Sequence, residues 1–208
     1  MGRLAEALDA LKAHFLRKRV RLVPIEDRQG LAEFIEGRAS LVAQTSLYGY
    51  IKTRAGTRFP ELFENEKFLE SINIAKWQIW CACVSDLSIY AGALIYAVRA
   101  DAGQVRALMG DVLKIVADRT GQPSEAGDNF REALSTVFDR LATVDFAQMG
   151  DLEKAFAQSP DALVHWSPIV DELKMLDEEI VRNSIRFRWQ EPRRDLRSAL
   201  KVESLLAE

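Results

Sequence analysis

The residues best suited to metal chemistry are few in this sequence and stand apart from one another. The histidines are His14 and His165, and neither has a glutamate three residues before it, as the Glu-x-x-His pairs of di-iron and di-manganese bundles require. The cysteines, Cys81 and Cys83, enclose a single residue, whereas zinc-binding pairs usually enclose two to four. We therefore predict no metal site and no cofactor.

Motifs for nucleophilic or phosphate chemistry are absent as well. The sequence contains no Gly-x-Ser-x-Gly motif of the serine hydrolases, and neither the Gly-x-Gly-x-x-Gly fingerprint nor the P-loop pattern. We therefore predict no catalytic residue from the sequence. This favours a non-enzymatic role and leaves open an enzyme with an unfamiliar helical site.

Asp86 is the charged residue in the most unusual position. It is the only one between Trp77 and Val98, and a buried carboxylate costs several kcal/mol unless it is paired or hydrogen-bonded. We expect an arginine from another helix beside it. The alternative is that Asp86 is the polar anchor of a ligand pocket whose other walls are Trp77, Trp80 and Tyr90.

Charge is segregated along the chain. The net charge is −3, but residues 59–181 carry −11 and both ends are basic. Clustered basic side chains suit an acidic protein surface, anionic lipid or nucleic acid. The predicted interaction surface consists of Lys12, Arg17, Lys18, Arg19, Arg21, Arg186, Arg188, Arg193, Arg194 and Arg197. The alternative is that the basic ends and the acidic middle attract one another within the fold.

Apolar periodicity and capping residues predict helices along the whole chain. Asp27 and Asn65 suit the cap position of the helices that follow them, and Ser159-Pro160 and Ser167-Pro168 have the pattern of a cap followed by a first-turn proline. No alternating strand pattern appears. The predicted helices occupy residues 3–19, 27–54, 65–100, 104–119 and 123–142, then two segments that begin at the Ser-Pro pairs and a last segment after Pro192.

The run from 77 to 98 is long enough to cross a bilayer. Gln78, Ser85, Asp86 and Ser88 lie inside it, and polar groups there are costly in lipid, so we predict a helix buried among other helices. The fold class is then all-α, a single-domain bundle of six to eight helices around a long apolar central helix, with residues 1–25 as a semi-independent N-terminal helix. Without a signal segment or a cysteine pair able to bridge, we predict a cytoplasmic protein.

The segment after Ser167 carries a coiled-coil-like pattern. Apolar residues at heptad-like spacing predict a helix with one continuous apolar face, and Glu178 and Arg182 can pair on its exposed side. The apolar positions are Ile169, Leu173, Leu176, Ile180 and Phe187.

Two stretches resemble the recognition region of TetR-type transcriptional regulators. These are Gly30-Leu-Ala-Glu-Phe-Ile35 and Leu47-Tyr48-Gly49-Tyr50-Ile51-Lys52. The resemblance implies an N-terminal helix-turn-helix that binds DNA, followed by a helical ligand domain. The family's small-Gly-Val-Ser turn is replaced by Ala39-Ser-Leu-Val-Ala-Gln44.

The charge segregation and the lack of a catalytic constellation together favour a non-enzymatic helical interaction protein. We expect an adaptor or assembly factor that docks through its basic terminal segments onto an acidic protein or an anionic membrane surface, and that forms homo-oligomers. The alternative is a TetR-like DNA-binding regulator with a helical ligand pocket.

Overall fold

The computed structural model describes residues 23–150 and 152–207, and these form an all-α bundle, as the sequence predicts. The predicted helix over residues 3–19 and the basic residues Lys12, Arg17, Lys18, Arg19 and Arg21 lie outside the described residues. The α-helices are α2 (Arg28–Ala55), α3 (Glu66–Arg99), α4 (Ala102–Thr120), α5 (Phe130–Thr143), α6 (Gln158–Trp166), α7 (Asp171–Arg188), α8 (Gln190–Ala199) and α9 (Val202–Ala207). Short 3-10 segments are η1 (Gly56–Glu64), η2 (Ser124–Ala126), η3 (Phe146–Gly150) and η4 (Leu152–Phe156).

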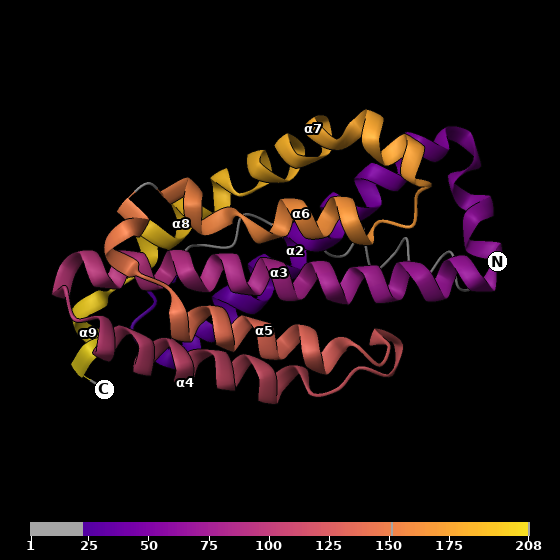
Figure 1. Ribbon diagram of the computed structural model, residues 1–208. Helices are drawn as coiled ribbons and strands as arrows, with labels where there is room; N and C mark the ends of the chain where they lie inside the picture. The colour runs from indigo at the N-terminus through magenta and orange to yellow at the C-terminus, as the bar shows by residue number, and fades with distance from the viewer. Residues whose placement is uncertain (1–22, 151, 208) are drawn as a thin grey trace.

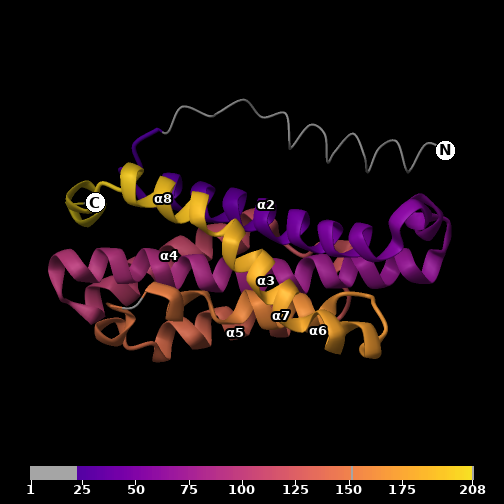
Figure 2. The same ribbon diagram turned by 90° about the horizontal axis from the view of Figure 1, so that it is seen from above.

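The centre of the bundle is α3, a helix of 34 residues that is about 51 Å long at 1.5 Å per residue. Helices α4 and α5 lie on one side of it and α6 on the other, with α7 outside α6 (Figure 1). Seen from above, α2 runs along α3 while α7 crosses the bundle obliquely (Figure 2). The long apolar run therefore forms the buried core, as predicted.

By length and composition α3 could also cross a membrane. In this fold, 72% of its most apolar window is covered by the other helices. Such burial is typical of the core helix of a bundle, where neighbouring side chains replace lipid.

Two of the predicted helix starts are confirmed by their caps. The carboxylate of Asp27 accepts the backbone N–H of Gly30 at 2.7 Å, and the carbonyl of the Asn65 side chain accepts that of Phe68 at 3.2 Å. Each satisfies one of the N–H groups that a helix leaves unpaired in its first turn. Local sequence was sufficient here because the cap and its partner lie within three residues.

Neither Ser-Pro pair caps a helix, although α6 does begin beside the first pair. Helix α6 begins at Gln158, so Ser159 lies inside its first turn, and Ser167 is the residue at which α6 ends. Helix α7 begins only at Asp171, after Val170. The hydroxyl of Ser167 donates back to the carbonyl of Leu163, a local bond that competes with capping the next helix.

The stretches that resemble TetR regulators lie in one continuous helix, α2. Residues 39–44 continue that helix without a turn, and Leu31, Ile35, Leu47 and Ile51 are all buried against the bundle. A helix-turn-helix needs a break between two helices, with the second free to enter a DNA groove. The described residues do not form that motif here.

The end of the described chain is tied to its beginning. The N–H of Ile25 donates to the carbonyl of Ala199, and the N–H of Lys201 donates to the carbonyl of Ile25, both at 2.9 Å. These bonds make an isolated parallel bridge between Ile25 and Leu200, and no longer strand pairing occurs among the described residues. The bridge places residue 25 beside the α8–α9 junction.

Candidate functional site

Asp86 is fully buried on α3 and reaches across to α6. Its Oδ1 accepts from the Arg140 guanidinium at 2.6 Å and from the backbone N–H of Gln158 at 3.1 Å. Its Oδ2 accepts from the backbone N–H of Ser159 at 2.8 Å. The predicted arginine from another helix is therefore Arg140 of α5, and the carboxylate also takes the place of the missing cap of α6.

Arg140 extends this network to two more groups. It also donates to the hydroxyl of Ser85 at 3.1 Å and to the carbonyl of Ala155 at 2.8 Å. Burial raises the pKa of the Asp86 carboxyl above its ordinary value, while the charge of Arg140 and the hydrogen bonds from Arg140 and Ser159 oppose that rise. Every partner belongs to the chain itself, so the network joins α3, α5 and α6.

The residues predicted to line a ligand pocket, Asp86, Trp77, Trp80 and Tyr90, are in contact with other side chains of the core. Trp77 packs edge-on against Trp80, with ring centroids 5.5 Å apart, and the indole N–H of Trp80 donates to Ser40 at 3.0 Å. Tyr90 lies against Phe156 with ring centroids 5.2 Å apart. Aromatic rings pack efficiently against one another, so these side chains fill the core instead of lining a space.

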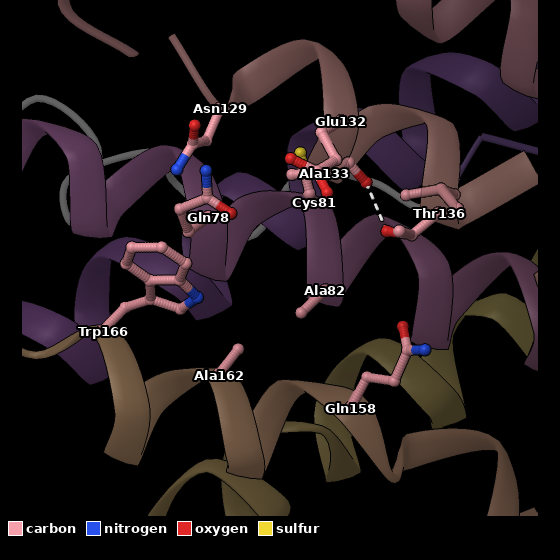
Figure 3. Close-up of a pocket in the computed structure, with 11 residues that line it drawn as sticks. Gln78, Cys81, Ala82, Asn129, Glu132, Ala133, Thr136, Gln158, Ala162 and Trp166 are labelled. Atoms are coloured by element: carbon pink, nitrogen blue, oxygen red, sulfur yellow. Dashed lines mark hydrogen bonds between the residues drawn. The ribbon is translucent and has the colours of Figure 1, made fainter. Parts of the chain in front are cut away.

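A cavity of about 520 Å³ opens instead between α3, α5 and α6 (Figure 3). Each helix contributes one face to it, at the spacing of successive helical turns. The lining residues are Gln78, Cys81 and Ala82 of α3, Asn129, Glu132, Ala133, Thr136 and Val137 at the start and along α5, and Gln158, Ala162 and Trp166 of α6. The sequence reasoning missed this site because its residues are scattered over about ninety positions and no motif joins them.

Three small side chains explain why the space is there. Ala82 of α3, Ala133 of α5 and Ala162 of α6 all line the cavity (Figure 3). Cores normally pack at crystal-like density, and a small side chain on each of the three helices leaves room that no neighbour fills. Alanines at these positions were the available sequence signal, but only the fold brings them to one cavity.

Gln78 is one of the polar residues that line this cavity. The residue is 7% exposed, and its amide nitrogen is buried without a hydrogen-bond partner among the described residues. Leaving such a donor buried and unpaired costs about 1–3 kcal/mol. In contrast, the hydroxyl of Thr136 on the same wall is already used, since it donates to the carbonyl of Ala133 at 2.7 Å (Figure 3).

The two cysteines are free thiols buried on α3. Burial raises the pKa of Cys81 to about 12, and burial together with the nearby charge of Asp86 raises that of Cys83. Thiolate is the reactive form of cysteine, so neither residue has the features of a nucleophile. Among the described residues, no group of histidine, cysteine and carboxylate side chains is placed to hold a metal ion.

The C-terminal basic residues do not form one uniform surface. Arg186, Arg188 and Arg197 are exposed, and Arg194 is exposed but pairs with Asp195 at 3.3 Å. Arg182 pairs with Asp161 and Glu178, which gives partial support to the alternative that basic ends attract the acidic middle within the fold. The surface residues left for a partner are on α7 and α8.

Arg193 departs from the prediction of an exposed docking residue. Its guanidinium carbon lies 5.6 Å from the ring centre of Tyr90 and 5.5 Å from that of Phe156. A guanidinium is attracted to the face of an aromatic ring within about 6 Å. Arg193 therefore belongs to the packing between α8 and the core, because α8 turns this side chain inward beside Pro192 and Leu196, which are buried.

The heptad-like face of α7 points away from the bundle. We call Leu173, Leu176, Ile180 and Phe187 the α7 seam. Leu176, Ile180 and Phe187 are 75%, 71% and 69% exposed, while the buried residues of α7 are Val181 and Ile185 on its other side. Most large apolar side chains exposed among the described residues belong to α7 or to Val170 just before it.

No protein-family model matches the chain, and neither a curated protein nor a solved structure is significantly similar to it.

Proposed function

We propose that the protein is a non-enzymatic helical interaction protein that assembles by helix–helix docking on the α7 seam. The observation that carries this proposal is the exposure of an apolar stripe with coiled-coil spacing on the outermost helix. Contiguous apolar surface on a folded protein usually marks an interaction site. Heptad spacing is the pattern that a second helix recognises by knobs-into-holes packing.

The occupant that fits the seam is α7 of a second copy. The first turn of α7 carries Asp171 and Glu172, and its last turn carries Arg186 and Arg188. If two copies pair antiparallel, the acidic start of one helix lies beside the basic end of the other, and both seams have the same spacing. Such charge pairing favours one orientation of the helices.

An anionic membrane fits the seam less well than a helix does. The acidic start of α7, with exposed Glu178 and Glu179 further along, would be repelled by anionic lipid heads. An antiparallel α7 instead brings Arg186 to Glu172. The exposed basic residue Arg197 on α8 stays outside this pairing, and we propose that it contributes to docking an acidic protein onto the dimer.

Sedimentation of the full chain tests the seam. The wild type is expected to form a dimer whose population rises with concentration, and the double variant Leu176→Glu with Ile180→Glu is expected to remain a monomer with unchanged circular dichroism. Met175→Glu is the matched control, because Met175 is 77% exposed but about 100° from Leu176 around the helix. A monomeric wild type, or loss of the dimer in the control as well, would refute the proposal.

A second measurement tests the choice of partner. The wild type is mixed with polyglutamate or with vesicles of phosphatidylcholine and phosphatidylserine. Salt-sensitive binding to polyglutamate that weakens in Arg197→Gln supports an acidic protein partner. Binding to the vesicles alone would overturn that choice in favour of lipid.

A further inference from the structure

The cavity between α3, α5 and α6 has the dimensions of a small-molecule site. Pockets for small molecules have volumes of roughly 300–1,000 Å³, mostly apolar walls and a few polar groups that orient the ligand. The volume here is about 520 Å³. Ala82, Ala133 and Ala162 line it together with Val137 and the ring of Trp166, so a ligand needs an apolar body to fill the space between them.

The charged residue on the lining is a carboxylate, Glu132. Figure 3 shows it next to Ala133 on the α5 side of the cavity, and it is exposed to solvent there. Its carboxylate makes no hydrogen bond or ion pair with another residue that the structure describes. Within that same part of the chain, no basic side chain lines the cavity. The negative charge at the mouth is therefore not neutralised by a neighbour.

The charge of the surrounding chain has the same sign. The lining residues lie between Gln78 and Trp166, within the stretch 59–181 that carries a net charge of −11. Arg140 of α5 does not offset this charge at the cavity, because its guanidinium is paired with Asp86 at 2.6 Å. A concave site in a negative field raises the local concentration of cations and repels anions.

The wall formed by α6 is held in place before any ligand arrives. The backbone N–H of Gln158, whose side chain lines the cavity, donates to the buried carboxylate of Asp86. Asp86 is in turn paired with Arg140. A site whose walls are already ordered loses less conformational entropy on binding.

We infer that this cavity binds a small organic cation in which a protonated amine stands next to a flat apolar group. The ammonium stays at the mouth and donates to the carboxylate of Glu132, an ion-assisted hydrogen bond. The flat group lies between the three alanines and against the ring of Trp166, which favours both flat apolar groups and a nearby positive charge. The ammonium keeps part of its hydration there, so the apolar walls receive only the uncharged part of the ligand.

Benzylamine is the probe for this inference, since it joins an ammonium group to a single flat ring. Titration into the ¹⁵N-labelled full chain is followed at the indole N–H of Trp166 and the backbone N–H of Ala162. We expect saturable shifts at both groups with a dissociation constant on the order of 1 mM. Benzyl alcohol, which has the same shape without the charge, is expected to bind roughly three- to fivefold more weakly. Benzoate should cause no saturable shift, because its charge is repelled.

Removal of one charge tests the role of Glu132. Glu132→Gln keeps the shape of the side chain, so the affinity for benzylamine should fall roughly three- to fivefold to that of benzyl alcohol, while benzyl alcohol binds as before. Asp139→Asn is the matched control. It removes a carboxylate from an exposed position two turns further along α5 that does not line the cavity, and it should change both affinities by less than about twofold, because salt screens charges at that distance.

Filling the space tests the location. Ala133→Leu should abolish the binding of both benzylamine and benzyl alcohol, while Ala142→Leu, the same change at an exposed position of α5, should leave both unchanged. If Ala133→Leu does not fold, Ala162→Leu fills the same space from α6.

Three results would overturn the inference. They are the absence of saturable shifts with benzylamine in the wild type, a preference for benzylamine over benzyl alcohol that is missing or survives Glu132→Gln, and binding that survives the filled cavity. None of them depends on whether the chain dimerises through α7, because the seam residues do not line the cavity.

Discussion

The backbone N–H of Ser159 donates to the carboxylate of Asp86 at 2.8 Å, across 73 positions of the sequence. Asp86 stands in the middle of the longest helix, and Ser159 stands in the first turn of a short one. The bond therefore fixes where α6 begins on the surface of α3. Since α6 also forms a wall of the cavity and supports α7, this contact positions both candidate sites.

Replacing Asp86 by alanine should lower the free energy of unfolding by about 3–5 kcal/mol, because it leaves Arg140 with its charge buried and unpaired. Urea unfolding followed by circular dichroism measures the change. Ser85→Ala is the matched control, since it removes one acceptor from the same guanidinium and should cost only about 0.5–1.5 kcal/mol. Equal losses in the two variants would mean that the ion pair contributes little.

The pH dependence of the free energy of unfolding should reveal the raised pKa of Asp86. Because its pKa is raised in the folded state above the ordinary 3.8, the folded protein holds this proton to higher pH than the unfolded chain does. The stability that this difference in pKa contributes is fully present below pH 3.8 and is lost as the pH rises through the raised pKa. The stability advantage of the wild type over Asp86→Asn should therefore shrink with rising pH, measured by urea unfolding at a series of pH values. An advantage that grows would show that Arg140 dominates over burial.

Arg193 and Arg197 should respond differently to truncation. Arg193→Ala removes the guanidinium from above Tyr90 and Phe156 and should destabilise the protein by about 1–2 kcal/mol. Arg197 is exposed, and Arg197→Ala should change stability by less than about 0.5 kcal/mol. Thermal unfolding of both variants distinguishes them. If Arg193→Ala leaves the stability unchanged, Arg193 belongs to the docking surface and not to the packing of α8.

Gly92 and Gly110 offer a matched pair of helical glycines. A Cβ at Gly92 would lie 2.5 Å from a ring carbon of Phe146, whereas one at Gly110 would meet nothing within 4 Å. Gly92→Ala should therefore cost about 1–3 kcal/mol through overpacking. Gly110→Ala should stabilise α4 by up to about 1 kcal/mol. Stabilisation by both changes, measured by thermal unfolding, would mean that the Phe146 ring moves aside freely.

Helix class, the central position of α3 and the caps at Asp27 and Asn65 were predictable from the sequence. Each depends on interactions within a few residues or on the overall apolar content of a segment, and both are visible in a linear pattern. The need of Asp86 for a partner was also predictable, because the cost of burying a charge does not depend on the fold. The identity of that partner was not.

The features that depend on contacts between distant residues were decided only by the tertiary structure. Ser159 looked like a cap in the sequence, but its own N–H is one of the first-turn donors that a helix leaves unpaired, and Asp86 from another helix accepts it. The cavity depends on three alanines from three helices meeting around one space. No local pattern records that meeting.

The apolar stripe of α7 shows both what the sequence determines and what only the tertiary structure determines. Heptad spacing in the sequence determined that Leu176, Ile180 and Phe187 share one face of a helix, since 3.6 residues make a turn. The sequence could not determine what covers that face, because burial depends on where neighbouring helices pack. In the fold, Val181 and Ile185 on the opposite side make the contact with the bundle, and the stripe is left exposed to solvent.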